Sequence, residues 1–323
     1  MFLLFLIPSI LGSPESDAKD LNEAFNYSTL ITVIYEKKYL ERQKMMETFR
    51  RVYGEEAYFN LWNKLGDLPK ELSIGIIDNQ AFYDAKLLNL GLTRSFYDED
   101  TLSELMLTRT SQEIRTIKKA YKRLDHRDLC DDIDGRSSGD LKGVLLALCA
   151  ADRDESEVVD EKLALEDCQN LYAYGPYNYR IDKDGINSIL FNRNYNQLRR
   201  MFEIFSEFEY ITPIQTVMNK RTIEDMIEQE YSFSAERALQ QYIKTMKHRA
   251  GYFASLIEGG LRGVSGERQV IRTIFGRAGV DLSEIVKAFG GKDKLVESIR
   301  KSQNLTRITK QALIAILNAN ENV

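Results

Sequence analysis

The serine motif at residues 135–139 has the residue types that come closest to catalytic chemistry. Its sequence, Gly-Arg-Ser-Ser-Gly, matches the G-x-S-x-G pattern of hydrolase nucleophiles. That pattern requires a strand that leads into the serine and a helix that follows it. Residues 131–133 have helical periodicity, and Ser137 and Ser138 suit the N-cap of the next helix. The motif therefore predicts a turn between helices and not a nucleophile.

The other candidates for catalysis or metal binding are also incomplete. Residues 182–185, Asp-Lys-Asp-Gly, begin like a calcium loop but lack a further oxygen ligand before the glycine and a closing glutamate. Asp182 is better suited to be a helix N-cap. His126 and His248 lie near predicted helix ends among basic residues, which is typical of solvated histidines. We find no catalytic constellation and no zinc spacing, and we expect a protein that is not an enzyme.

Composition indicates a soluble, all-α protein. The chain has 323 residues, of which 43% are hydrophobic and 29% are charged, and it is long enough to bury a sizeable core. Only five prolines and abundant Leu, Ile, Glu, Lys and Arg favour helices over flexible linkers. A net charge of −5 with no block of five basic residues gives no electrostatic footprint for nucleic acid. We therefore expect no nucleic-acid partner.

Residues 1–12, MFLLFLIPSILG, form an apolar run. The run is too short for a transmembrane helix, which needs about 20 apolar residues. We predict that residues 1–13 are either a secretory signal peptide or an N-terminal tail that packs on the body of the protein. A cleaved leader predicts the secretory pathway or the extracellular space. An uncleaved tail predicts a cytoplasmic protein.

The cysteines leave the compartment open. Cys130, Cys149 and Cys168 are odd in number and cannot all pair within the chain. The first two lie on predicted helices, as ordinary buried thiols do, and we interpret them in that way. Two glycosylation sequons, at Asn26 and Asn304, matter only if the chain is secreted.

Residues 98–149 carry the most regular helical pattern of the chain. Acidic residues at 98–100 suit a helix N-terminus, and the apolar residues that follow are three and four apart. Thr110 and Glu113 have the spacing of a capping box. The predicted helices of this unit span residues 82–90, 99–107, 110–126, 128–133 and 141–148, with a turn at 135–139.

This unit resembles an annexin repeat. The similarity lies in the segments LMLTRTSQEIRTIKKAY and LCDDIDGRSSGDLKGVLLAL: an Arg after the second helix, Glu-Ile-Arg opening the third, Asp-Asp-Ile in the fourth and Ser-Gly opening the fifth. Basic residues recur at Lys37, Arg109, Arg193 and Arg277, with separations of 72, 84 and 84. The resemblance implies an all-α fold of four repeats, each of four to five short helices, that form a slightly curved disc.

The predicted repeats cover nearly the whole chain after residue 13. They span residues 14–80, 81–153, 154–249 and 250–323, with an insertion in the third repeat near 206–221. In annexins, calcium is bound by backbone carbonyls of a glycine loop between the first two helices and by a carboxylate from the turn before the last helix. Here the carboxylate positions hold Lys64, Arg136, Glu230 and Asn304.

No repeat retains both halves of a calcium site. Only the fourth repeat keeps loop glycines, Gly263 and Gly266, and only the third keeps the carboxylate, Glu230. These three residues are the residual calcium-site positions. We expect that no cofactor is required and that calcium binds weakly or not at all.

The resemblance implies that the interhelix loops face a phospholipid surface. Aromatic and apolar residues beside arginines in these loops suit the head-group region of a membrane. The predicted membrane contacts are Arg94, Phe96, Tyr97, Tyr174, Tyr177, Tyr179, Arg180, Leu261, Arg262 and Val264. We predict a peripheral, calcium-independent or weakly calcium-dependent phospholipid-binding protein. The alternative is a structural scaffold that uses the same residues to bind a protein partner without lipid.

Overall fold

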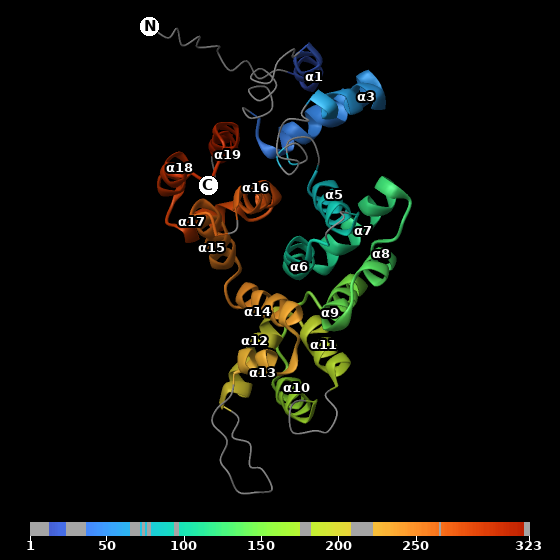
Figure 1. Cartoon of the computed structure of the whole chain (residues 1–323), viewed down its shortest axis with the longest axis vertical. Coiled ribbons are helices and arrows are strands. Elements are labelled where there is room, and N and C mark those ends of the chain that lie inside the picture. Colours follow the sequence, from blue (N-terminus) through green and yellow to red (C-terminus); the bar gives the residue numbers. More distant parts are fainter. Residues whose placement is uncertain are drawn as a thin grey trace, which may run out of the picture. The chain divides into compact units, whose positions relative to one another are not determined.

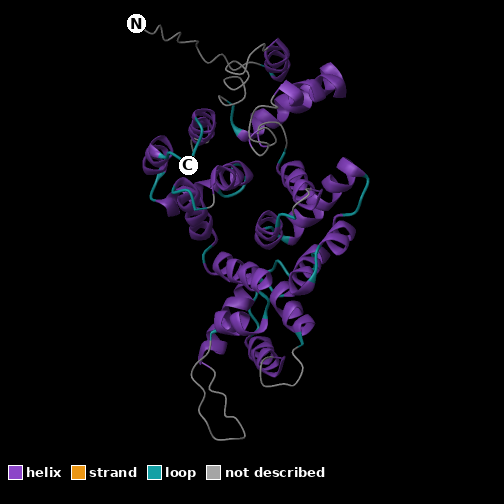
Figure 2. Cartoon of the chain, in the orientation of Figure 1, coloured by secondary structure: helices purple, strands orange, loops and turns teal. Residues whose placement is uncertain are grey.

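The computed structural model describes residues 13–23, 37–64, 72, 75, 79–93, 97–174, 182–207, 222–264 and 266–319. Across these residues the chain forms helices joined by loops and turns, and no strand is present in them (Figure 2). The predicted all-α fold is confirmed. Residues 1–12 of the predicted leader at 1–13, and most of the predicted insertion, lie outside the described residues.

The helices follow one another in the order shown in Figure 1. Their bounds are α1 (Pro14–Glu23), α3 (Tyr39–Lys64), α5 (Gln80–Thr93), α6 (Glu99–Thr108), α7 (Ser111–Asp125), α8 (Leu129–Arg136), α9 (Gly139–Ala150), α10 (Glu161–Tyr174), α11 (Lys183–Asn192), α12 (Tyr195–Glu207), α13 (Ile223–Glu230), α14 (Phe233–Lys247), α15 (Arg249–Leu261), α16 (Gly266–Arg277), α17 (Leu282–Phe289), α18 (Lys292–Lys301) and α19 (Arg307–Ala319). Within the described residues, no helix is both long and apolar enough to cross a membrane.

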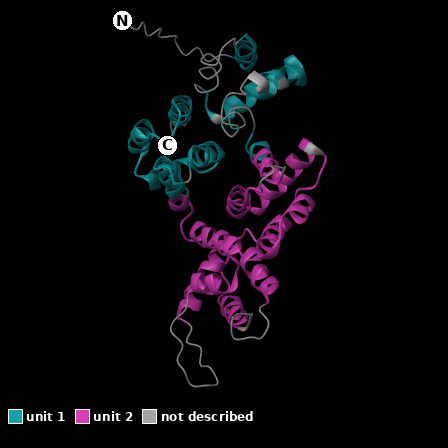
Figure 3. Cartoon of the chain, in the orientation of Figure 1, with its two compact units in different colours: residues 1–83, 253–323 teal, residues 84–252 magenta. Residues whose placement is uncertain are grey.

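The chain divides into two compact units, which Figure 3 shows in different colours. One unit contains residues 1–83 and 253–323, and the other contains residues 84–252. The unit 84–252 therefore holds most of the predicted second and third repeats. In it, α14 packs against both α6 and α9, so the two repeats share a core.

The regular stretch forms the helices that its caps predict. Thr110 accepts from the backbone N–H of Glu113, and the Glu113 carboxylate accepts from the N–H of Thr110, so the capping box is present. The turn at 135–139 is wrong in its extent, because α8 continues through Gly135 to Arg136. Only Ser137 and Ser138 separate α8 from α9. Ser137 thus follows a helix and not the strand that a hydrolase nucleophile requires.

An ion pair joins the first helix of a repeat to the basic residue that ends the second. Arg109 donates from Nε and Nη2 to the Asp84 carboxylate at 2.7 and 2.9 Å, and both side chains are 1% exposed. Burial lowers the pKa of Arg109, but the adjacent Asp84 outweighs it and raises that pKa above its ordinary value. Arg193 and Asp167 form the same bidentate pair at 2.7 and 3.0 Å.

The outer repeats use variants of this pair. In the first, Lys37 Nζ lies 2.7 Å from Asp17 Oδ1 of α1. In the fourth, the positions equivalent to the aspartate are Gly251 and Tyr252. Arg277 instead donates to Asp281, four residues later, at 2.6 Å. The recurring basic residues that revealed the repeats are therefore structural residues.

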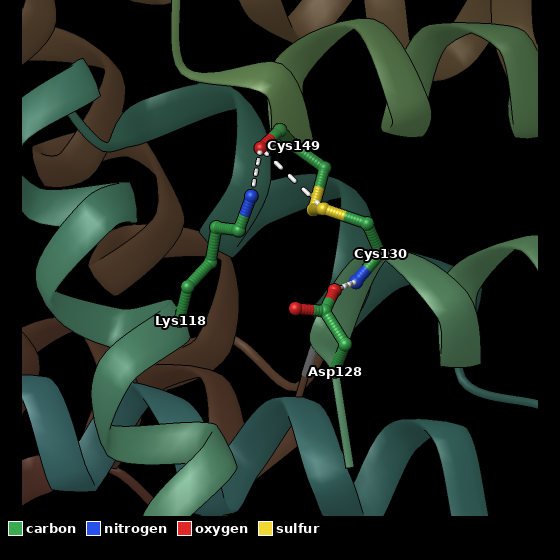
Figure 4. The surroundings of a disulfide bond; sticks show 4 residues. All are labelled: Lys118, Asp128, Cys130 and Cys149. Atoms are coloured by element: carbon green, nitrogen blue, oxygen red, sulfur yellow. Dashed lines mark hydrogen bonds between the residues drawn. A yellow bond between two sulfur atoms is a disulfide. The ribbon is translucent and has the colours of Figure 1, made fainter.

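A disulfide joins Cys130 of α8 to Cys149 of α9, so their interpretation as thiols is wrong (Figure 4). Figure 4 shows two polar side chains beside the bridge. Lys118 donates to the carbonyl oxygen of Cys149 at 3.0 Å, and Asp128 accepts from the N–H of Cys130 at 2.8 Å. Cys168 is a buried free thiol, and burial raises its pKa to about 12, which keeps it protonated and unreactive.

Breaking the buried ion pair by Asp84→Asn will destabilise the unit that contains it. The substitution leaves the Arg109 guanidinium buried without this counter-charge, and such changes cost about 3–5 kcal/mol. Urea unfolding followed by circular dichroism measures the loss. Glu161→Gln is the matched control, because it breaks the exposed Arg200–Glu161 pair and should leave the midpoint almost unchanged. Equal effects of the two variants would contradict this assignment.

Removal of the disulfide will lower stability by about 3 kcal/mol, the value expected from loop-closure entropy for a loop of about 20 residues. The test compares the urea unfolding of the oxidised protein with that of the Cys130→Ser, Cys149→Ser double variant. Dithiothreitol should destabilise the wild type and leave the double variant unchanged. An unfolding midpoint of the wild type that does not respond to reductant would show that the bridge is absent or contributes nothing.

Candidate functional site

The candidate site of each repeat consists of two segments, the loop between its first two helices and the turn between its last two. In the second repeat these segments contact each other directly. The hydroxyl oxygens of Tyr97, in the loop after α5, and Ser137, in the turn after α8, lie 2.5 Å apart. Tyr97 is half-buried, and burial raises the pKa of its phenol. A neutral hydrogen bond therefore connects the two segments.

In the fourth repeat the same two segments meet at a backbone carbonyl. The carbonyl oxygen of Leu261, at the end of α15, accepts from Ser302 Oγ at 2.8 Å and from Asn304 Nδ2 at 3.0 Å. Both donors come from the turn between α18 and α19. A carbonyl oxygen has two lone pairs, so these bonds occupy its acceptor capacity.

The loop glycines of the fourth repeat shape the end of α15. Gly263 has φ +88°, and its N–H bonds to the carbonyl of Gly260 while the N–H of Val264 bonds to that of Gly259. This is the Schellman end of a helix, in which a left-handed residue favours glycine. A Cβ at residue 263 would lie 2.9 Å from Asn304 Oδ1, so the amide packs directly over the glycine.

A calcium ion does not fit this arrangement. The Asn304 amide occupies the carboxylate position and directs an N–H at Leu261 O, which would otherwise be available to a cation. The carboxylate of Glu267, which follows Gly266, accepts from the N–H of Thr306 at 2.7 Å. In the second repeat the carboxylate position holds exposed Arg136, whose charge would repel a cation. No group of three His, Cys, Asp or Glu side chains suited to a metal occurs in the part of the chain that the structure describes.

The third repeat keeps its carboxylate in a different setting. Glu230 is the last residue of α13 and is 6% exposed. The next residue, Tyr231, donates its hydroxyl to Asn187 of α11 at 3.0 Å. The predicted loop partner of Glu230, residues 175–181, lies outside the described residues. The geometry of the predicted calcium position in this repeat therefore lies outside what the structure describes.

The predicted membrane contacts of the fourth repeat are only partly exposed. Val264 is 85% exposed, and the Arg262 side chain is 73% exposed and pairs with Glu258 at 2.6 Å. Leu261 is 8% exposed and belongs to the buried core, so its side chain offers little surface for such a contact. The sequence places Leu261 at the end of a helix, but this position does not determine whether its side chain points toward the core or toward solvent.

The contacts predicted for the other repeats lie largely outside what the structure describes. These are Arg94, Phe96, Tyr177, Tyr179, Arg180 and the side chain of Tyr174. A neighbouring tyrosine, Tyr172, packs on the body of its repeat: its ring stacks on Phe205 at 4.5 Å, and its hydroxyl donates to the carbonyl of Phe205. Sequence reasoning missed Ser137 and Ser302 as bridging residues, although small hydroxyl residues in turns are a usable signal.

Similarity to known proteins identifies the family of this chain. Residues 83–148 match the family model described as Annexin. Annexin A13 of Canis lupus familiaris is 30% identical over 284 residues, which cover 86% of this chain and 87% of that protein. The chain belongs to the annexin family. Human annexin A13 is 29% identical over 309 residues, which cover 94% of this chain and 95% of that protein.

Solved annexin structures agree with this assignment over nearly the full length. A structure of annexin III has a TM-score of 0.81 at 27% identity and covers 96% of this chain, with 95% of the annexin III chain covered in turn. A structure of an annexin A8 mutant with an intact N-terminus has a TM-score of 0.80 at 26% identity and covers 98% of both chains. The predicted family is confirmed, and phospholipid binding is the activity that annexin membership supports.

The hydrogen bond from Asn304 to the Leu261 carbonyl in the fourth repeat predicts the behaviour of the Asn304→Asp variant. The variant replaces a donated hydrogen bond with a carboxylate beside the Leu261 carbonyl, which we expect to cost about 1–3 kcal/mol. Thermal melting in EGTA should show a lower midpoint, and millimolar calcium should restore it in this variant only. Asn304→Ala is the matched control, since it loses the bond without gaining a charge. A calcium-induced rise of similar size in the wild type would contradict the interpretation of this loop.

Proposed function

We propose that this annexin binds phospholipid surfaces peripherally and without calcium. The observation that carries the proposal is the direct hydrogen bonding between the two loop segments of a repeat. Tyr97 with Ser137, and Asn304 with Leu261, connect the segments that a calcium ion bridges in the family's sites. Loops that are already joined need no cation to hold them in position.

Lipid contact would come from exposed apolar and basic side chains of these loops. Val264 and Arg262 supply such a pair in the fourth repeat. An arginine near an anionic surface contributes about 1 kcal/mol, and an apolar side chain adds a term that does not depend on calcium. The tyrosines and arginines predicted in the second and third repeats would act in the same way, and they remain predictions.

The proposal describes a binding protein and not an enzyme, with no required cofactor and no nucleic-acid partner. The compartment follows from the leader: a cleaved leader means the secretory pathway or the extracellular space, and an uncleaved one means the cytoplasmic face of a membrane. A scaffold that binds proteins without lipid is the second candidate. It would use the same exposed loop residues, because protein interfaces also favour Tyr and Arg.

Co-sedimentation with phosphatidylserine–phosphatidylcholine vesicles separates the two candidates. We expect binding in EGTA, and we expect submillimolar calcium to change the affinity by no more than roughly a few-fold. Replacement of Tyr174, Tyr177 and Tyr179 with Ser should weaken binding while thermal melting stays the same. A micromolar calcium site in titration calorimetry, or binding only with calcium, would contradict calcium independence, and no binding in either condition would leave the scaffold.

A further inference from the structure

Phe233 is an aromatic side chain on the surface that the loop predictions did not include. It is the first residue of α14 and is 76% exposed. Among the described residues it is the only aromatic one in the set of large, exposed hydrophobic side chains. Other aromatic rings of the same unit pack inside, as Tyr121 and Phe205 do.

Three contacts hold the first turns of α14 on both sides of this ring. The N–H of Ser232 donates to Asp140 at 2.9 Å, and Ser234 Oγ donates to Glu99 at 2.6 Å. One turn later, Arg237 pairs with Asp100 at 2.6 Å. Because these partners come from α6 and α9, Phe233 cannot turn inward without moving a helix that is fixed at several points.

The same contacts locate Phe233 at the edge that carries Tyr97. Glu99 and Asp100 open α6, directly after the loop that contains Tyr97. Asp140 lies in the first turn of α9, directly after the turn that contains Ser137. Since Tyr97 and Ser137 contact each other, the starts of α6, α9 and α14 share one edge of this unit. Phe233 therefore lies on the same edge as Tyr97, which is proposed to contact lipid.

Charge at this edge indicates which interaction the ring supports. The carboxylates of Glu99, Asp100 and Asp140 each accept from a donor of the protein, and Asp140 also receives Lys183 Nζ at 2.8 Å. The guanidinium of Arg237 lies 5.6 Å from the centroid of the Phe233 ring. The two cations and three carboxylates carry a net charge of −1, which weakly repels an anionic surface, so an apolar contribution must dominate here.

We propose that Phe233 is a membrane anchor that inserts its ring into the interfacial region of a phospholipid bilayer. The proposal rests on the proposed phospholipid binding and adds a residue from the turn between the last two helices of a repeat. An aromatic ring beside an arginine suits the level of the head groups. The apolar area of the ring makes this contact insensitive to salt and to calcium.

Vesicle binding by Phe233→Ser tests the proposal in EGTA with the full chain and phosphatidylserine–phosphatidylcholine vesicles. We expect roughly tenfold weaker binding than the wild type, as loss of a buried aromatic side chain implies. Thermal melting should stay the same, because the ring is exposed. Val158→Ser is the matched control: Val158 is 72% exposed in the same unit, on the segment between α9 and α10, and its substitution should not alter binding.

A second variant reports insertion directly. Phe233→Trp, in a Trp62→Phe background that removes the single native tryptophan, should bind like the wild type and shift its fluorescence to the blue with vesicles. Wild-type affinity of Phe233→Ser, or no blue shift, would overturn the anchor while phospholipid binding stands. No vesicle binding by the wild type would overturn both proposals.

Discussion

A buried guanidinium needs a counter-charge, and in the second repeat the packing of the first two helices depends on how it is supplied. Arg109 and Asp84 are both almost fully buried, and the bidentate carboxylate supplies the counter-charge and two hydrogen bonds that a buried arginine needs. Asp84 lies on the first helix of the repeat and Arg109 ends the second. The pair therefore fixes the two helices at both sides of the loop that joins them. At the other end of these helices, Tyr97 in the loop is held by its own hydrogen bond to Ser137.

The fourth repeat shows that its buried arginine, Arg277, can be neutralised by a carboxylate from a different position. Its first helix has no aspartate at the equivalent position, and Arg277 pairs with Asp281 while its guanidinium lies 5.1 Å from the ring centroid of Phe253. The Arg277–Asp281 pair does not include the first helix, and the guanidinium contacts that helix through the Phe253 ring. Ser302 and Asn304 supply a connection from the other side of the repeat, because both bond to the last residue of α15. The amide that fills the calcium position thus also holds the repeat together.

Local chemistry made much of the fold predictable from the sequence. The capping box at Thr110 acts over a few residues, and the structure confirms it. Contacts between residues on different helices could not be predicted from the sequence. The disulfide between Cys130 and Cys149, for example, depends on how two separate helices pack together. The sequence identified the residue types of the candidate site, since it places the uncharged Asn304 where the family's sites have a carboxylate. Its geometry was not, because the inward direction of Leu261 depends on the neighbouring helices and not on the residue itself.

Loops joined by the protein's own hydrogen bonds respond to different signals from loops joined by an ion. An ion that binds only the folded state stabilises by an amount that grows with its concentration relative to its dissociation constant. A hydrogen bond such as that between Asn304 and Leu261 contributes about 1 kcal/mol at every calcium concentration. In the proposed function, the loops are therefore always in the binding geometry. Affinity is then set by the exposed side chains and by the composition of the surface they meet, and in the fourth repeat a calcium ion would have to compete with the Asn304 amide for the Leu261 carbonyl.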